Sequence, residues 1–130
     1  MRIAKTPIAA LTAAFGLWAG AALAADFIPY TPAQFTALGG KPGEVVVDVH
    51  ATWCSTCAAQ QAALKTLLES DKYKKVTVLV VDFDAQKDAM AKFGVSQRST
   101  LIVFKQGQEK VRATGVTDPA QIASLLDTGL

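Results

Sequence analysis

Cysteine and histidine are scarce in this chain of 130 residues, which has two cysteines and one histidine. A closed zinc site needs four ligands, so the chain could complete one only with a second copy or a borrowed ligand. Both cysteines lie in HATWCSTCAAQ, residues 50–60. A disulfide between them would close a very short loop, so it would add little stability compared with one that joins distant segments. Three alternatives remain for the pair: a weak structural staple, a metal clamp or a reversible redox site.

The sequence also lacks repeats, low-complexity tracts and linkers, and it has only one dense cluster of charged residues. It has 13 Lys and Arg residues against 11 Asp and Glu residues. A nucleic-acid surface requires clustered Lys and Arg. We interpret the one dense charged cluster, residues 71–75, as the solvated end of a helix. We therefore expect no nucleic-acid partner and a single domain with one modest core.

The first residues have the pattern of a secretory signal. Arg2 and Lys5 precede a mostly apolar run over residues 8–23, and Ala22-Leu23-Ala24 follows as a small-residue cleavage site. We predict a signal peptide over 1–24 and a mature domain over 25–130 that is periplasmic or otherwise exported, where disulfides form and persist. An uncleaved membrane anchor is the alternative, although the run is slightly short for a span of ~20 residues.

The rest of the chain alternates between β-branched runs and segments with helical spacing. Gly, Pro and capping residues mark the boundaries. The pattern predicts strands over 27–30, 44–51, 76–83, 100–105 and 109–114, and helices over 31–39, 54–69, 86–93 and from 118 onward. The alternation indicates parallel crossovers, and a final hairpin around 106–108 adds antiparallel pairing. The fold class is therefore α/β, with a mixed central β-sheet flanked by helices.

The predicted elements place the first cysteine, Cys54, at the start of a helix. The unpaired N–H groups and the positive end of the helix dipole favour its thiolate there. Cysteines of Cys-x-x-Cys pairs at helix starts have pKa values between roughly 3.5 and 7.5, against roughly 8.5 for a free thiol. Cys57 lies one turn further along, where it could attack a mixed disulfide formed on Cys54. This chemistry favours the redox alternative.

These features together resemble the thioredoxin family over essentially the whole of residues 25–130. The resemblance rests on VDVHATWCSTC at 47–57, VDFD at 81–84, FGV at 93–95, STLIVFKQG at 99–107 and Gly115. It implies a thioredoxin-like fold and thiol–disulfide oxidoreductase activity without a cofactor. It also implies that Cys54 is the attacking thiol, Cys57 the resolving thiol and Asp48 the buried acid that manages the Cys57 proton. Substrate contacts would come from Trp53, Arg98, Ser99 and Thr100.

Asp48 is also unusual on its own chemistry, as a carboxyl group inside an apolar strand. Burial without a partner should raise its pKa, which suits a group that accepts and donates a proton near neutrality. The family's usual lysine partner is replaced by Val80, which should raise this pKa further. A structural acid with a hydrogen bond at a strand end is the alternative.

The family's cis-proline facing the cysteines is replaced by Ser99. A cis peptide bond before a non-proline residue costs about 2.5–4 kcal/mol, so we expect a trans bond between Arg98 and Ser99. Arg98 would lower the pKa of Cys54 if its guanidinium turned toward that thiol, and would otherwise be a surface charge. His50 lies on the same face of its strand as Asp48, and either a catalytic role or a packed ring fits that position.

We therefore expect an exported thiol–disulfide oxidoreductase that acts on protein disulfides, as a monomer. The direction is expected to be reduction, because the sequence lacks the large inserted helical domain of exported oxidases. A reductant must be recharged, which implies a membrane thiol–disulfide electron donor as a partner. The alternative is a soft-metal module that binds Cu(I) or zinc through the Cys-x-x-Cys pair.

Overall fold

The computed structural model describes residues 27–130, so the predicted signal peptide over 1–24 lies outside the described residues. In chain order the elements are β1 (Phe27–Pro29), α1 (Pro32–Gly39), β2 (Glu44–His50), α2 (Ser55–Leu68), the 3₁₀ helix η1 (Asp71–Tyr73), β3 (Val76–Asp82), α3 (Lys87–Phe93), β4 (Thr100–Lys105), β5 (Gln108–Thr114) and α4 (Pro119–Asp127). Each predicted boundary lies within one residue of the observed one. Within residues 27–130, no helix combines the length and the apolar character needed to cross a membrane.

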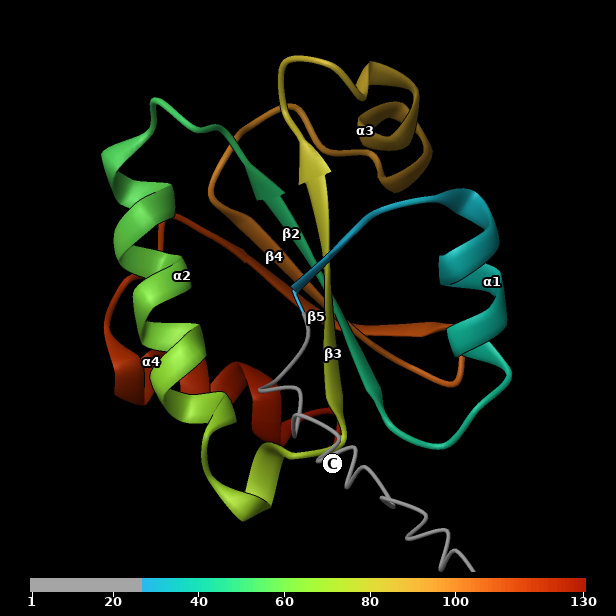
Figure 1. Ribbon diagram of the computed structural model, residues 1–130, viewed down its shortest axis with the longest axis vertical. Coiled ribbons are helices and arrows are strands. Elements are labelled where there is room, and N and C mark those ends of the chain that lie inside the picture. The colour runs from blue at the N-terminus through green and yellow to red at the C-terminus, as the bar shows by residue number, and fades with distance from the viewer. Residues whose placement is uncertain (1–26) are drawn as a thin grey trace, which may run out of the picture.

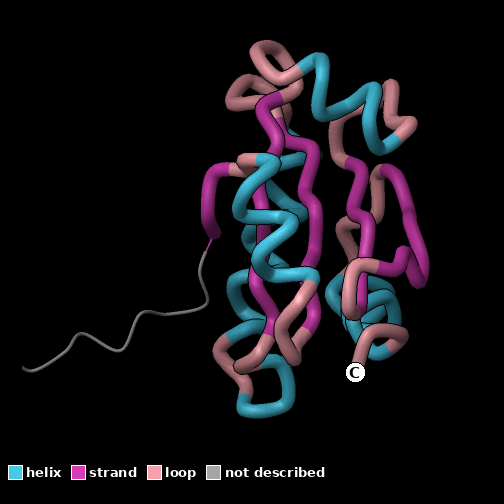
Figure 2. The backbone as a smooth tube through the Cα atoms, turned by 90° about the vertical axis from the view of Figure 1, so that its right-hand side faces the viewer, coloured by secondary structure: helices cyan, strands magenta, loops and turns pink. Residues whose placement is uncertain are grey.

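The five strands form one mixed sheet in the order β1-β3-β2-β4-β5, which confirms the predicted fold class. Strand β3 pairs in parallel with both β1 and β2, whereas β4 pairs antiparallel with β2 and β5. Figure 2 shows the short β1 at one edge of the sheet and the β4–β5 hairpin at the other. The hairpin turn is Gln106-Gly107, and both residues have positive φ angles (49° and 77°), as a tight two-residue turn requires.

The helices cover both faces of the sheet: α2 and α4 lie on one side, and α1 and α3 on the other (Figure 1). Strand β2 runs through the middle, so its side chains alternate between two cores. Val45, Val47 and Val49 belong to the core beneath α1 and α3, whereas Val46 belongs to the core beneath α2 and α4. This double burial explains why the strand reads as an almost continuous run of valines.

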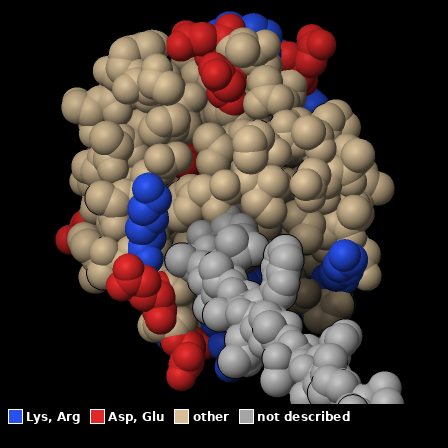
Figure 3. Space-filling view, in the orientation of Figure 1, with Lys and Arg blue, Asp and Glu red and all other residues tan. Residues whose placement is uncertain are grey.

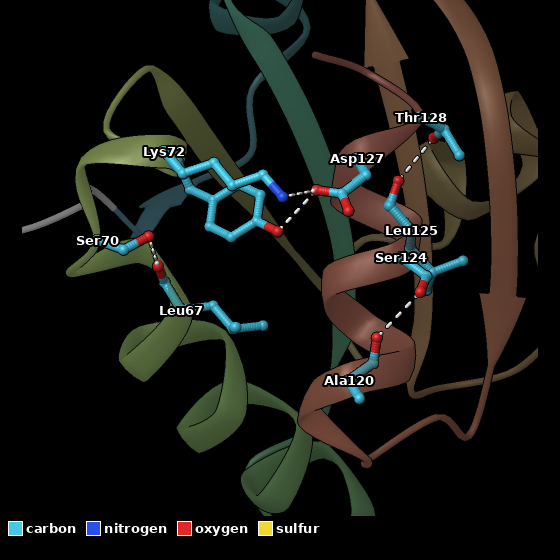
Figure 4. A network of polar contacts seen from close by, with 9 residues as sticks. Leu67, Ser70, Lys72, Ala120, Ser124, Leu125, Asp127 and Thr128 are labelled. Atoms are coloured by element: carbon cyan, nitrogen blue, oxygen red, sulfur yellow. Dashed lines mark hydrogen bonds and ion pairs between the residues drawn. The ribbon is translucent and has the colours of Figure 1, made fainter.

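The charged cluster at 71–75 is more than the solvated helix end that we expected. Tyr73 is only 4% exposed, and its hydroxyl donates to Asp127 Oδ1 at 2.7 Å. Lys72 Nζ lies 2.8 Å from the same oxygen, so η1 is tied to the end of α4 (Figure 4). These contacts were not predicted from the sequence, because Tyr73 stands among lysines and its partner in α4 follows far along the chain.

Candidate active site

The cysteines lie at the end of the molecule toward which β2 and β3 run, the upper end of Figure 1. Strand β2 ends at His50, a short turn follows, and Cys54 is the N-cap of α2. Its Sγ accepts a hydrogen bond from the Cys57 N–H at 3.2 Å. Both thiols are buried, Cys57 completely and Cys54 with 6% of its surface exposed. The more accessible thiol is therefore the one that meets the helix N-terminus.

The two thiols differ in acidity. Burial raises the pKa of the Cys54 thiol, but hydrogen bonds from Cys57 and Ser99 and a smaller contribution of Arg98 outweigh it and lower that pKa to about 7. Burial and the neighbouring Cys54 thiol raise the pKa of Cys57. Near neutral pH the negative charge therefore resides mainly on Cys54, while Cys57 keeps its proton.

Ser99 stands directly against the two sulfur atoms. Its Oγ lies 3.4 Å from Cys54 Sγ and 3.0 Å from Cys57 Sγ. Residues 27–130 contain no cis peptide bond, so the bond between Arg98 and Ser99 is trans, as its cost predicts. Ser99 has a φ of 59°, in the left-handed region that non-glycine residues seldom adopt.

Asp48 is fully buried on the face of β2 that α2 covers. Gln61 Nε2 in α2 donates to its Oδ2 at 2.8 Å, so the carboxyl group is not entirely unpartnered as the sequence suggested. Its Oδ1 has no partner among the described residues. Burial raises the pKa of Asp48, while the Gln61 hydrogen bond and the charge of His50 oppose that rise. The expected direction is confirmed, and Val80 is its register partner on β3.

An aromatic and cationic cluster forms the exposed rim of the site. Trp53 is 59% exposed, and its Nε1 donates to Asp84 Oδ2 at 2.8 Å. The Arg98 guanidinium carbon stands 4.7 Å from the centre of the Trp53 ring. Arg98 thus lies over the indole and also lowers the pKa of Cys54. In Figure 3, acidic side chains gather at the same end of the molecule.

Beside the cysteines lies a pocket of about 290 Å³. It is lined by Thr56, Phe83, Ser96, Gln97, Arg98, Ser99 and Gly115. Thr100, which we expected among the substrate contacts, is only 3% exposed, and its hydroxyl contacts Gln97 O and Thr114 Oγ1 at 2.9 Å each. Its side chain is therefore engaged within the fold, and any contact with substrate would come from its backbone.

The sequence reading missed two glutamines and one glutamate. Gln60 is fully buried and its Nε2 donates to Ser99 O at 3.1 Å and Val116 O at 2.9 Å, while Gln61 holds Asp48. The spacing of Gln60 from Cys57 and Leu64, three and four residues, could have placed it on the buried face of the helix. Glu44 is 97% buried at the start of β2, and nothing in the sequence around it indicated this burial.

The soft-metal alternative receives no support. Within residues 27–130, no group of three or more His, Cys, Asp and Glu side chains is arranged to hold a metal ion. His50 was the nearest candidate for a third ligand. It is half-buried, and its Nδ1 has no hydrogen-bond partner within the described part of the chain.

Known proteins resemble this chain in sequence and in fold. The family model for thioredoxin matches residues 27–128. Thioredoxin from Chlamydia muridarum is 38% identical over 84 residues, which cover 65% of this chain and 80% of that protein. Thioredoxin from Staphylococcus aureus is 35% identical over 90 residues, or 69% of this chain and 86% of that protein. The crystal structure of Trxlp from Edwardsiella tarda superposes with a TM-score of 0.75 at 39% identity, covering 78% of this chain and 98% of that one.

The family match spans nearly all of the described residues, and the relatives are covered over most of their length. The Cys54–Cys57 pair lies at the start of a helix with one acidic and one proton-retaining thiol. This chain therefore belongs to the thioredoxin family and is a thiol–disulfide oxidoreductase.

Proposed function

We propose that this protein is an exported reductant of protein disulfides, recharged by a membrane thiol–disulfide electron donor. The observation that carries the direction is the acidity of Cys54, whose pKa is lowered only to about 7. Cysteines of this type have pKa values of roughly 7 in a reducing thioredoxin and roughly 3.5 in a strong oxidant. A very acidic thiol stabilises the reduced form and so makes the protein an oxidant. The moderate acidity of Cys54 favours reduction.

In the first step the Cys54 thiolate attacks one sulfur of the substrate disulfide. The substrate S–S bond breaks, a mixed disulfide forms on Cys54, and one substrate sulfur leaves as a thiolate. The low pKa of Cys54 supplies the thiolate near pH 7, and its partial exposure admits the substrate. Trp53 and Arg98 lie on the rim that the substrate backbone would cross.

In the second step Cys57 resolves the mixed disulfide. Its thiol loses a proton, its sulfur attacks Cys54 Sγ, and the second substrate sulfur leaves as the Cys54–Cys57 disulfide forms. Burial raises the pKa of Cys57, so this step needs a base. We assign that role to Asp48, because burial also raises its pKa toward the range in which a carboxyl group exchanges protons near neutrality.

The direction is tested by the equilibrium redox potential of the Cys54–Cys57 disulfide in glutathione buffers. A reductant should have a potential near roughly −270 mV, whereas a value near roughly −120 mV would identify an oxidant and refute the proposed direction. The measurement uses the purified protein and thiol alkylation followed by mass spectrometry. Its outcome does not depend on which cysteine attacks first.

Export is proposed from the leader-like pattern of residues 1–24. A reporter enzyme that requires disulfides for folding, fused after residue 24, should become active only if the segment directs export. N-terminal sequencing of the protein recovered from cells should then begin at Ala25. Recovery of the intact chain from the membrane fraction would instead favour an uncleaved anchor, and from the cytosol would refute export.

A further inference from the structure

The Ser99 hydroxyl occupies a position between the two reacting sulfur atoms. It lies within hydrogen-bond range of both, at 3.4 Å from Cys54 Sγ and 3.0 Å from Cys57 Sγ. A hydroxyl group has one hydrogen to donate and two lone pairs to accept. It can therefore donate to one sulfur while it accepts from the other, which a proline at this position cannot do.

The backbone of Ser99 is held from three directions. Its N–H donates to Val49 O at 2.8 Å, and its carbonyl oxygen accepts from Gly115 N at 2.9 Å and from Gln60 Nε2 at 3.1 Å. The residue is only 4% exposed. Because the backbone is held and the side chain is enclosed, the Ser99 Oγ atom stays in place. The hydroxyl hydrogen can still rotate about the C–O bond.

Ser99 also adopts a backbone conformation that glycine would adopt with less strain. Its φ of 59° places Cβ in the left-handed region, which disfavours L-residues. The short polar side chain is thus retained at a position where the backbone alone favours glycine. A function of the hydroxyl group at the sulfur atoms would explain why this strained backbone conformation is kept.

We propose that the Ser99 hydroxyl is a catalytic hydrogen-bond switch that donates to Cys54 in the reduced enzyme and to Cys57 during resolution. This inference rests on the attacking and resolving roles proposed above. In the reduced enzyme the hydroxyl hydrogen points to the Cys54 thiolate, while its oxygen accepts from the Cys57 S–H. This arrangement stabilises the negative charge on Cys54, while burial keeps the proton on Cys57.

Attack on the substrate removes the charge from Cys54, because its sulfur becomes part of the mixed disulfide. The Ser99 hydrogen is then released and turns to Cys57 Sγ, the closer of the two sulfurs. There it stabilises the thiolate that forms as the Cys57 proton passes to Asp48. Ser99 loses no proton in either step, so the acid–base work stays with Asp48 and the hydroxyl supplies only the hydrogen bond.

The test compares Ser99→Ala and Ser99→Gly with wild type, using the full-length protein. Both variants keep the backbone N–H but lack the hydroxyl, and glycine also relieves the positive φ. Ser124→Ala is the matched control, because Ser124 is an exposed serine of α4 that does not line the pocket beside the cysteines. The probe is dithiobisnitrobenzoate, which releases one coloured thiolate on attack and a second on resolution, so stopped-flow absorbance separates the steps.

Loss of a hydrogen bond to a charged sulfur should slow each step about tenfold at pH 7. Thiolate absorbance should also show a higher pKa for Cys54 in both variants, while Ser124→Ala matches wild type. Resolution at the wild-type rate in Ser99→Ala and Ser99→Gly would overturn the switch, even if Cys54 became less acidic. Slowing in Ser99→Ala alone would mark a backbone effect and overturn it too. The glutathione potential tests the direction of the reaction separately.

Discussion

Strand β2 carries two buried carboxyl groups four residues apart on the same face, Glu44 at its start and Asp48 near the cysteines. Burial is the main cause of a raised pKa in both. Their neighbours differ. At Asp48 the Gln61 amide and the charge of His50 favour ionisation, whereas at Glu44 the charge of Asp127 opposes it and only Lys105 favours it. The comparison shows that burial raises the pKa of a carboxyl group. The neighbouring side chains then decide whether that group can exchange a proton.

The surroundings of Glu44 favour a carboxyl group that stays neutral. Neither of its oxygens has a hydrogen-bond partner among the described residues, and its pKa is raised to about 8. The C-terminal turn lies directly against it, because a Cβ on Gly129 would be 2.7 Å from Glu44 Cδ. Glu44 therefore provides an internal reference, a buried acid without cysteines, against which the role of Asp48 can be measured.

The largest effect on activity should come from substitution of the two cysteines. Cys54→Ser should abolish the reduction of insulin disulfides, because no other thiolate can attack, and Cys57→Ser should still attack but accumulate mixed disulfides. Glu44→Gln should keep nearly full activity, which restricts the chemistry to one end of β2. Trapped partners are counted on non-reducing gels. If Cys57→Ser traps no more than the double cysteine variant, the order of the two thiols is wrong.

Asp48→Asn should slow resolution about 100-fold while leaving attack nearly unchanged, because an amide cannot accept the Cys57 proton. The pKa of Asp48 is raised by burial, so wild-type resolution should slow as the pH falls through that pKa and Asp48 becomes protonated. The resolution rate of Asp48→Asn should not show this decrease at low pH. Stopped-flow rates between pH 5 and 9 provide the measurement. Equal rates for both steps in wild type and variant would leave Asp48 with a structural role only.

Glu44→Gln should change how stability depends on pH. The pKa of Glu44 is raised in the folded protein to about 8 from 4.5, so the folded state holds a proton that the unfolded state has lost between these values. Stability is therefore full below about pH 4.5 and falls as the pH rises toward 8. Removing the acid should reduce this fall by roughly 3 kcal/mol, measured by urea unfolding at pH 5 and 8.

Glu109→Gln is the matched control for that experiment. The Arg112 guanidinium lowers the pKa of Glu109, so its contribution is present at higher pH and is lost as the pH falls. Glu109 is exposed, so its change should be small and opposite in sign. An unaltered slope in Glu44→Gln would show that the buried glutamate is not the group that titrates, and would weaken the comparison with Asp48.

The smallest effect should come from the cations at the two ends of β2. Arg98 lowers the pKa of Cys54, as the last of several contributions, so Arg98→Ala should raise that pKa slightly. Lys105→Ala should leave Cys54 unaffected, because Lys105 acts on Glu44 instead. Thiolate absorbance against pH measures both variants. A Cys54 titration that is identical in Arg98→Ala and wild type would reduce Arg98 to a surface charge stacked on Trp53.

The boundaries of the elements could be predicted because their signals are local. Thr31 caps α1 by accepting from Gln34 N at 3.1 Å, and Gly94 ends α3 with a φ of 63°. The same holds for Cys54, whose place at a helix N-terminus follows from the strand and helix that flank it. The partner of Asp48 could not be predicted, because Gln61 looks like any polar residue of a helix until the helix is placed on the sheet.

By itself, the sequence determined the order of strands and helices, the family and the position of the two cysteines, since each depends on neighbours within a few residues along the chain. The sequence also indicated that the pKa of Asp48 is raised, but only the tertiary structure decided which side chains adjust the acidity of the groups around the cysteines. It brought the Ser99 hydroxyl to both sulfurs across more than 40 residues of chain, set Gln61 on Asp48 and buried Glu44 without a hydrogen-bond partner among residues 27–130. A pKa responds to solvent and charge within a few ångströms in space, and those distances exist only after the sheet and helices have packed.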